Sequence, residues 1–183
     1  MINLNMVSEI EKYQYLCGSI CISEEIKDGL LNKDMSDIEK NQAINEIQSM
    51  IRTKIIYPAQ AKNITVYDTD GNIFYDLGYD GFYQDDVDML LDRLRLENQD
   101  VWAYVHTYRD RDILVLGRRI YEQYSESRVI GYTLISIDEK IFSKTVLEPV
   151  GLADSSNIMY MNMDGTVLSS WDRDIALGEK VDS

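Results

Sequence analysis

Hydrophobic positions in the first third of the chain recur every three or four residues, which is the spacing of an amphipathic helix. Ser36 and Glu39 have the spacing of a capping box, so they predict the start of a second helix, which Pro58 ends. Between the two helices, residues 27–34 predict a bend. We therefore expect residues 1–57 to form a helical stalk with one break, and its long apolar stripe favours self-association into a homodimer. The first part of that stripe comprises Ile10, Tyr13, Leu16, Cys17, Ile20 and Cys21.

From residue 63 the period of the hydrophobic positions changes to two, as in half-buried strands. Two short apolar runs flank Asp70-Gly71, a pair that is typical of β-hairpin turns. Helical spacing returns over residues 85–96. Asp138 has the position of an N-cap for a short helix that runs from residue 139 to about residue 147. Strands joined by short turns pair as neighbours, so the pattern predicts an α+β fold with a five-stranded antiparallel sheet. We expect helices on one face of this sheet and a small cavity on the other. The segments are strands 64–67, 72–75, 102–108, 113–124 and 129–137, with a helix over 85–96.

Residues 158–170 repeat the pattern of residues 64–76. Each copy has an Asp-Gly pair, and the two pairs, Asp70-Gly71 and Asp164-Gly165, are 164 − 70 = 94 residues apart, about the size of one small domain. We interpret the repeat as two copies of one αβ module, the second of which is truncated. The expected division is the stalk at 1–57, the first module at 58–148, and a linker with the start of the second module at 149–183.

Charge and motif content exclude several functions. The chain has 32 acidic and 18 basic residues, and its net charge of −14 disfavours binding to nucleic acid or anionic lipid. Cys17 and Cys21 share one helix face, either as buried structural thiols or as a disulfide or reactive pair. The sequence contains no catalytic triad pattern, phosphate-binding loop or zinc spacing, so we predict neither an enzyme nor a cofactor or metal site.

Four features carry a family resemblance. They are the long N-terminal helix, the strand and turn at 64–71, the Arg118-Arg-Ile-Tyr121 string followed by 129–138, and the second opening hairpin at 159–170. With these features the chain resembles the extracytoplasmic Cache (PAS-like) sensor domains of bacterial membrane receptors. It is most similar to the double-Cache regions of YesM-like transmembrane histidine kinases.

The resemblance implies a ligand-sensing input domain outside the cytoplasm, in a parent protein anchored in the cell membrane. The implied output is a histidine kinase that receives the signal through the N-terminal helix. Two alternatives remain open. One is a dimerisation or interaction module that binds no ligand, and the other is the input domain of a chemoreceptor or a diguanylate cyclase.

Candidate ligand-binding residues come from two neighbouring strands and from a tyrosine-rich loop. Trp102, Tyr104 and His106 alternate along one strand and therefore share a face, to which the next strand adds Arg118. If this face lines the cavity, two aromatic walls and a planar cation would suit a small anionic or zwitterionic ligand. Tyr75 and Tyr83 complete the predicted set. The alternative is that the aromatic residues pack in the core, that His106 is structural, and that the arginine pairs with an acidic neighbour.

Overall fold

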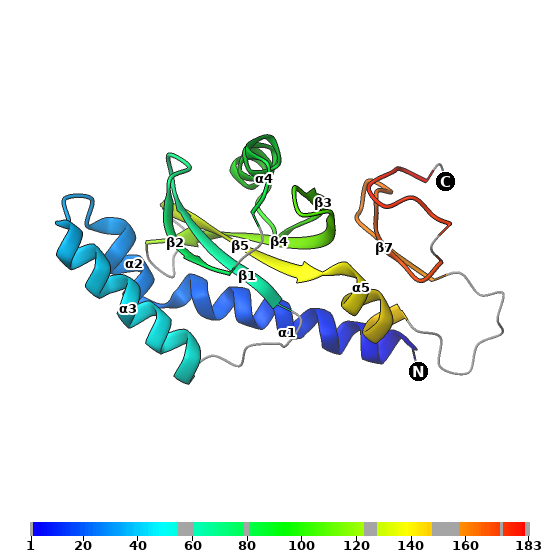
Figure 1. The fold of residues 1–183 in the computed structure, drawn as a ribbon, viewed down its shortest axis with the longest axis horizontal. Coiled ribbons are helices and arrows are strands. Elements are labelled where there is room, and N and C mark those ends of the chain that lie inside the picture. Colours follow the sequence, from blue (N-terminus) through cyan, green and yellow to red (C-terminus); the bar gives the residue numbers. More distant parts are fainter. Residues whose placement is uncertain are drawn as a thin grey trace.

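The computed structural model describes residues 2–54, 61–78, 81–122, 128–147, 158–172 and 174–181. Figure 1 shows their arrangement. The N-terminal part contains three helices, α1 (Ile2–Ile22), α2 (Glu24–Leu31) and α3 (Asp37–Lys54). The central part contains β1 (Ala61–Asp68), β2 (Ile73–Leu77), α4 (Gln84–Leu96), β3 (Val101–Thr107), β4 (Arg111–Tyr121) and β5 (Val129–Asp138). The last part contains α5 (Glu139–Phe142), the π-helical turn η1 (Ser143–Leu147), β6 (Met159–Met161) and β7 (Val167–Ser170).

The central strands form one antiparallel sheet in the order β2-β1-β5-β4-β3. This confirms the predicted α+β class and the five-stranded sheet. β1 pairs with β2, and β3, β4 and β5 pair in sequence, while the pairing of β1 with β5 joins the two halves and leaves β2 and β3 at opposite edges. The register places Thr65 of β1 between Leu134 of β5 and Asp76 of β2.

Helices cover both faces of the sheet, which corrects the expectation of one covered face. α1 lies along one face against β4 and β5, whereas α4 packs on the other face over β3 and β4 (Figure 1). The reason is that both faces are apolar. Leu90, Leu91 and Leu94 of α4 are buried against Val115 and Leu134 of the sheet, away from the core that α1 covers. Burial of that leucine stripe requires an apolar surface on the sheet opposite α1.

The predicted bend at residues 27–34 is confirmed only at its end, where Lys33 and Asp34 form a turn, whereas residues 27–31 are helical. Ser23 interrupts the first helix, and its side chain accepts a hydrogen bond from the backbone N–H of Ile26 at 3.3 Å. α2 then continues to Leu31, so the turn falls at residues 32–36. Gly29 lies inside α2 and contacts β2. A Cβ at this position would come within 2.2 Å of the Phe74 ring, so a larger residue would not fit. The glycine therefore permits close packing of α2 on β2 and does not mark a bend.

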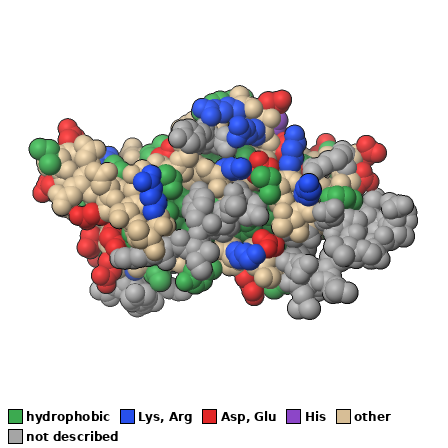
Figure 2. All heavy atoms as spheres, turned by 60° about the horizontal axis from the view of Figure 1, so that its bottom comes forward, with side chains coloured by type: hydrophobic (Ala, Val, Ile, Leu, Met, Phe, Trp, Pro, Cys, Tyr) green, Lys and Arg blue, Asp and Glu red, His purple; other side chains and the backbone are tan. Residues whose placement is uncertain are grey.

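The predicted capping box is confirmed at the start of α3. The backbone N–H of Ser36 donates to Glu39 Oε2 at 2.8 Å, and the backbone N–H of Glu39 donates to Ser36 Oγ at 3.4 Å. Helix α3 is described to Lys54, and the predicted stop at Pro58 lies outside the described residues. Acidic side chains gather at the end of the molecule formed by α2 and α3 (Figure 2).

Both predicted hairpins are present, and each turns at a glycine with positive φ. The φ angle is +88° at Gly71 and +85° at Gly165, a region that glycine adopts without strain. β6 and β7 form a separate two-stranded sheet that contacts β3 and η1. Within the described residues, no helix has the length and apolar character needed to cross a membrane.

Candidate functional site

A pocket of about 200 Å³ opens on the α4 face of the sheet, and we name it the α4-face pocket. Its floor is polar because Asn63, Thr65 and Tyr67 alternate along β1 and point away from the core that α1 covers, where Ile64 and Val66 lie. Its other members come from β2, from the start of α4 and from the segments beside them. They include Asp76, Phe82, Gln84 and Tyr108.

Hydrogen bonds join the polar floor of the α4-face pocket into one cluster. Asn63 Nδ2 donates to Thr65 Oγ1 at 2.9 Å and to Asp76 Oδ1 at 3.1 Å. Thr65 Oγ1 in turn donates to Asp76 Oδ1 at 2.9 Å. Asn63 and Thr65 are 3% and 2% exposed, whereas Asp76 is exposed to solvent. The cluster thus connects buried strand residues to a solvent-facing carboxylate.

One acceptor of this floor has no hydrogen-bond partner in the described part of the chain. It is the side-chain oxygen of Asn63, which is buried. Ser136 lies opposite Asn63 on β5, and its buried hydroxyl likewise lacks a partner among the described residues. A buried polar atom left unpaired costs roughly 1–3 kcal/mol, so such atoms are rare. The Asn63 oxygen lies against Gly78, where a Cβ would come within 1.9 Å of it.

Aromatic residues form the walls of the α4-face pocket. Burial, with a smaller contribution from the nearby Asp76 carboxylate, raises the pKa of Tyr67 to about 12, so its hydroxyl stays protonated at neutral pH. Tyr83 and Tyr108 meet edge to face beside the pocket, with ring centroids 6.1 Å apart. Gly81 allows this approach, because a Cβ there would lie 2.0 Å from the Tyr108 hydroxyl.

Trp102 and Tyr104 share one face of β3, as predicted, but this is the face that α1 and the β6–β7 hairpin cover. They line a second cleft of about 760 Å³ between the α4–β3 region and the β6–β7 hairpin, which we name the hairpin cleft. The ring of Trp102 meets the ring of Tyr160 edge to face at 5.8 Å. Both aromatic residues are therefore partly packed against the second sheet.

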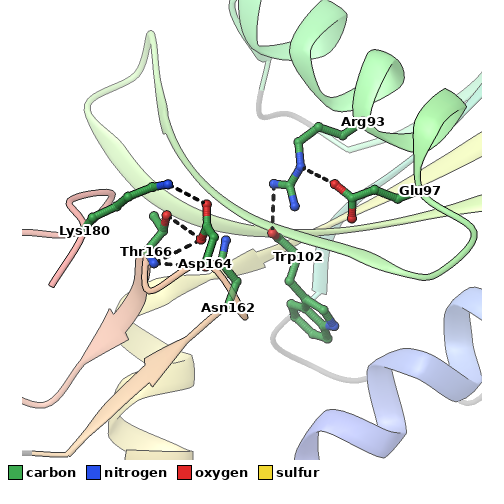
Figure 3. Close-up of polar contacts among 7 residues, drawn as sticks. All are labelled: Arg93, Glu97, Trp102, Asn162, Asp164, Thr166 and Lys180. Carbon is green, nitrogen blue, oxygen red and sulfur yellow. Dashed lines mark hydrogen bonds and ion pairs between the residues drawn. The ribbon is translucent and has the colours of Figure 1, made fainter. Parts of the chain in front are cut away.

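Charged groups around the hairpin cleft are paired within the protein (Figure 3). Arg93 of α4 donates to Glu97 Oε1 at 3.0 Å and to the backbone oxygen of Trp102 at 3.3 Å. In the β6–β7 turn, Asp164 accepts hydrogen bonds from Thr166, whose side chain donates at 2.8 Å, and pairs with Lys180 at 3.2 Å. These bonds lower the pKa of Asp164 to about 2, and the bond from the Thr166 side chain has the largest effect. The contacts order the walls of the cleft.

Arg118 pairs with Asp100, in line with the alternative in which this arginine has an acidic neighbour. Its Nε donates to Asp100 Oδ1 at 2.6 Å and its Nη2 to Oδ2 at 2.5 Å, and Nη1 donates to the backbone oxygen of Gln14 in α1 at 3.4 Å. The hydrogen bonds to Asp100 raise the pKa of Arg118. Cys17 and Cys21 lie nearby in α1 as buried thiols without a disulfide, and burial raises the pKa of Cys17.

The structure separates the remaining members of the predicted set. His106 is at the exposed end of β3, where its Nδ1 lies 3.0 Å from Asp112 Oδ1. Tyr75 is 1% exposed and belongs to the core on the α1 side, whereas Tyr83 lies on the opposite face. The predicted residues therefore do not surround one cavity, and their participation in ligand binding stays a prediction. Among the described residues, no group of three or more His, Cys, Asp or Glu side chains is placed to hold a metal ion.

Sequence reasoning missed Asn63, Thr65 and Asp76. A signal was present, because Asn63 and Thr65 alternate with Ile64 and Val66 in the first strand. Such alternation usually indicates a face exposed to water. Here the face is partly covered by α4, which turns an ordinary polar strand face into a buried polar floor.

Comparison with known proteins relates the chain to sensor domains through its fold. No family model and no curated protein matches the sequence. Among solved structures, the periplasmic domain of Vibrio cholerae LuxQ is 13% identical with a TM-score of 0.56, covering 94% of this chain and 76% of LuxQ. The ligand-binding domain of the Campylobacter jejuni chemoreceptor Tlp3, in complex with L-norvaline, is 10% identical with a TM-score of 0.57, covering 94% of this chain and 67% of that one.

A third similar structure is the extracellular domain of rpHK1S-Z16, a proposed histidine kinase. It is 16% identical with a TM-score of 0.57, and the match covers 98% of this chain and 72% of that chain. At these identities the likeness concerns the fold. The chain has the α+β fold of PAS/Cache-like sensor domains from histidine kinases and chemoreceptors.

Proposed function

We propose that this chain is the ligand-binding input domain of a membrane receptor and that a small polar molecule binds in the α4-face pocket. The observation that carries the proposal is the polar floor of the pocket, where Asn63 and Thr65 donate hydrogen bonds to the solvent-facing carboxylate of Asp76. A ligand that donates a hydrogen bond to this carboxylate would be held at the floor by a charge-assisted bond. The shared fold supports the proposal, since the similar domain of Tlp3 was solved with an amino acid bound.

The proposed signal passes through the sheet to α1. α1 packs on β4 and β5, and Arg118 of β4 donates to the backbone of Gln14 in α1. A ligand that binds one arrangement of the sheet more tightly than another would shift the population of α1 positions. We propose that the parent is a membrane-anchored histidine kinase of the YesM-like type, that this domain lies outside the cytoplasm, and that the fragment itself has no catalytic activity.

The proposed dimer forms through the exposed side of α1. Tyr15 and Ile22 are 64% and 54% exposed and lie seven residues apart, so they share one helix face. Sedimentation of the chain at micromolar concentration tests this assembly, and a monomer at all concentrations would count against it. The alternative outputs, a chemoreceptor or a diguanylate cyclase, differ in the domains that follow in the complete gene. A kinase domain beyond a transmembrane helix is the expected finding.

A ligand screen with two matched variants tests the site. Thermal unfolding with a panel of small metabolites should reveal a ligand, since a compound at 100 times its Kd stabilises by about 2.7 kcal/mol. Asn63→Leu conserves side-chain size and should abolish the shift, because it removes the amide that donates to Thr65 and Asp76 and orders the floor. Trp102→Ala changes the hairpin cleft and should leave the shift intact.

The two variants separate the two sites. If Trp102→Ala removes ligand binding and Asn63→Leu does not, the site is the one predicted from the sequence and our pocket is wrong. If no compound in a broad panel shifts the unfolding temperature, the interaction module that binds no ligand becomes the better hypothesis. Circular dichroism of both variants checks that they remain folded.

A further inference from the structure

The side-chain amide and threonine donors of the α4-face pocket are already engaged within the protein. Asn63 Nδ2 donates to Thr65 and Asp76, and Thr65 Oγ1 donates to Asp76. Gln84 Nε2 donates along α4 to Asp88 Oδ1 at 2.9 Å. The other side-chain donors that line the pocket are the hydroxyls of Tyr67 and Tyr108.

The acceptor that a ligand can reach in the same pocket is Asp76. Its Oδ1 accepts from Asn63 and Thr65, and its carboxylate faces solvent at the pocket edge. None of the described residues that line the pocket is a lysine, arginine or histidine. Arg109 lies over the Tyr108 ring, 6.0 Å from its centroid, but does not line the pocket. A carboxylate group on a ligand would be repelled by Asp76.

Resting on the proposed function, we propose that the ligand of the α4-face pocket is a small protonated amine. Its ammonium group would donate hydrogen bonds to the Asp76 carboxylate, which is an acceptor only. The rings of Tyr67, Phe82 and Tyr108 line the pocket and offer apolar contact and cation–π attraction to the same group.

Size and charge are consistent with this ligand class. The volume of about 200 Å³ lies below the roughly 300–1,000 Å³ that is usual for drug-sized ligands, so the ligand is compact. The net charge of −14 raises the local concentration of cations around the protein. The ligand class that we infer from the pocket is therefore an amine, whereas the sequence pattern predicts an anionic or zwitterionic ligand.

Matched compounds test the ligand class. Isothermal titration would compare butylamine, putrescine and histamine with butyrate, γ-aminobutyrate and L-alanine. We expect at least one amine to bind more tightly than every acid and zwitterion. Asp76→Asn keeps the side-chain shape and should weaken binding of that amine by roughly tenfold or more, because a charge-assisted hydrogen bond is lost. Asp85→Asn is the control, since Asp85 is also exposed but does not line the pocket.

The outcomes distinguish this inference from the proposed function. Tighter binding of an acid or zwitterion, lost in Asn63→Leu, would overturn the amine assignment and leave the pocket as the ligand site. Amine binding that Asp76→Asn and Asp85→Asn weaken equally would reflect general charge attraction and would also overturn the assignment. If none of the six compounds binds while the broad metabolite panel gives a ligand, the amine assignment is likewise wrong.

Discussion

At the residue scale, Asp112 links a half-buried tyrosine to a solvent-exposed histidine. Its Oδ1 accepts a hydrogen bond from the Tyr104 hydroxyl at 2.6 Å and lies 3.0 Å from His106 Nδ1. Asp110 adds a second carboxylate 3.2 Å from His106 Nε2. The hydrogen bond to Asp112, with the charges of both aspartates, raises the pKa of His106 above 6.5. Partial burial tends to raise the pKa of Asp112, but the hydrogen bonds from Tyr104 and His106 lower it.

This arrangement predicts a pH dependence with a defined sign. Because the pKa of His106 is raised in the folded state, its contribution to stability is fully present below pH 6.5, and it is lost as the pH rises through the folded pKa. His106 is the only histidine in the chain, so its ring proton signals in an NMR titration are unambiguous. We expect a pKa above 6.5 in the native protein and a lower value in Asp112→Asn. Asp85→Asn is the control, and a native pKa at or below 6.5 would contradict the assigned contacts.

At the element scale, helix boundaries depend on which side chains can bind the free backbone groups. Ser23 and Ser36 each accept a hydrogen bond from the backbone three residues later, and these two caps define the starts of α2 and α3. The capping box at Ser36 is local in sequence and was predicted. The start of α2 was not, because Gly29 in the same stretch is also typical of a turn and its packing against Phe74 involves a distant strand.

Removal of the α3 cap should weaken the helix measurably. Ser36→Ala is expected to lower the free energy of unfolding by about 1 kcal/mol, because the backbone N–H groups of the first turn lose their acceptor. Urea denaturation followed by circular dichroism measures this change. Ser49→Ala, at an exposed position within α3, is the matched control and should be neutral or slightly stabilising. Equal destabilisation by both substitutions would show that the cap contributes nothing specific.

At the scale of the whole molecule, the second sheet is docked on the first through a small set of contacts. The Tyr160 ring lies 5.8 Å from that of Trp102 and 5.7 Å from that of Phe142. Ser169 donates a hydrogen bond to the buried carboxylate of Glu139 at 2.7 Å. Aromatic contact and a charge-assisted bond therefore connect β6 and β7 to β3 and α5.

Truncation of the central tyrosine should loosen this docking without unfolding the main sheet. In Tyr160→Ala, we expect backbone amides of β6 and β7 to exchange with solvent at least about tenfold faster, because local opening costs less free energy. Amides in β4 and β5 should keep their protection. Met161→Ala, on the same strand and 43% exposed, is the control. Hydrogen exchange read by mass spectrometry makes the comparison, and a uniform loss of protection throughout the chain would contradict a separately docked hairpin.

Elements whose signals are local were predictable. The two Asp-Gly turns, the Ser36 capping box, the leucine stripe of α4 and the N-cap at Asp138 each depend on residues within about one helical turn or one hairpin. The antiparallel order of β3, β4 and β5 followed from their short connections. Local propensity and periodicity are sufficient at this range, so the α+β class could be derived from the sequence alone.

Tertiary structure decided the faces and the partners. Asp100 pairs with Arg118, 18 residues later, and Asp76 meets Asn63 across two strands, because strand register brings them together. Periodicity shows which residues share a face but not which helix covers it. Because α4 packs on the face opposite α1, the polar pocket forms around Asn63, Thr65 and Asp76 and not around the residues predicted from the sequence. The sequence alone determined the elements and the sheet, whereas packing between distant segments determined where a ligand can be enclosed.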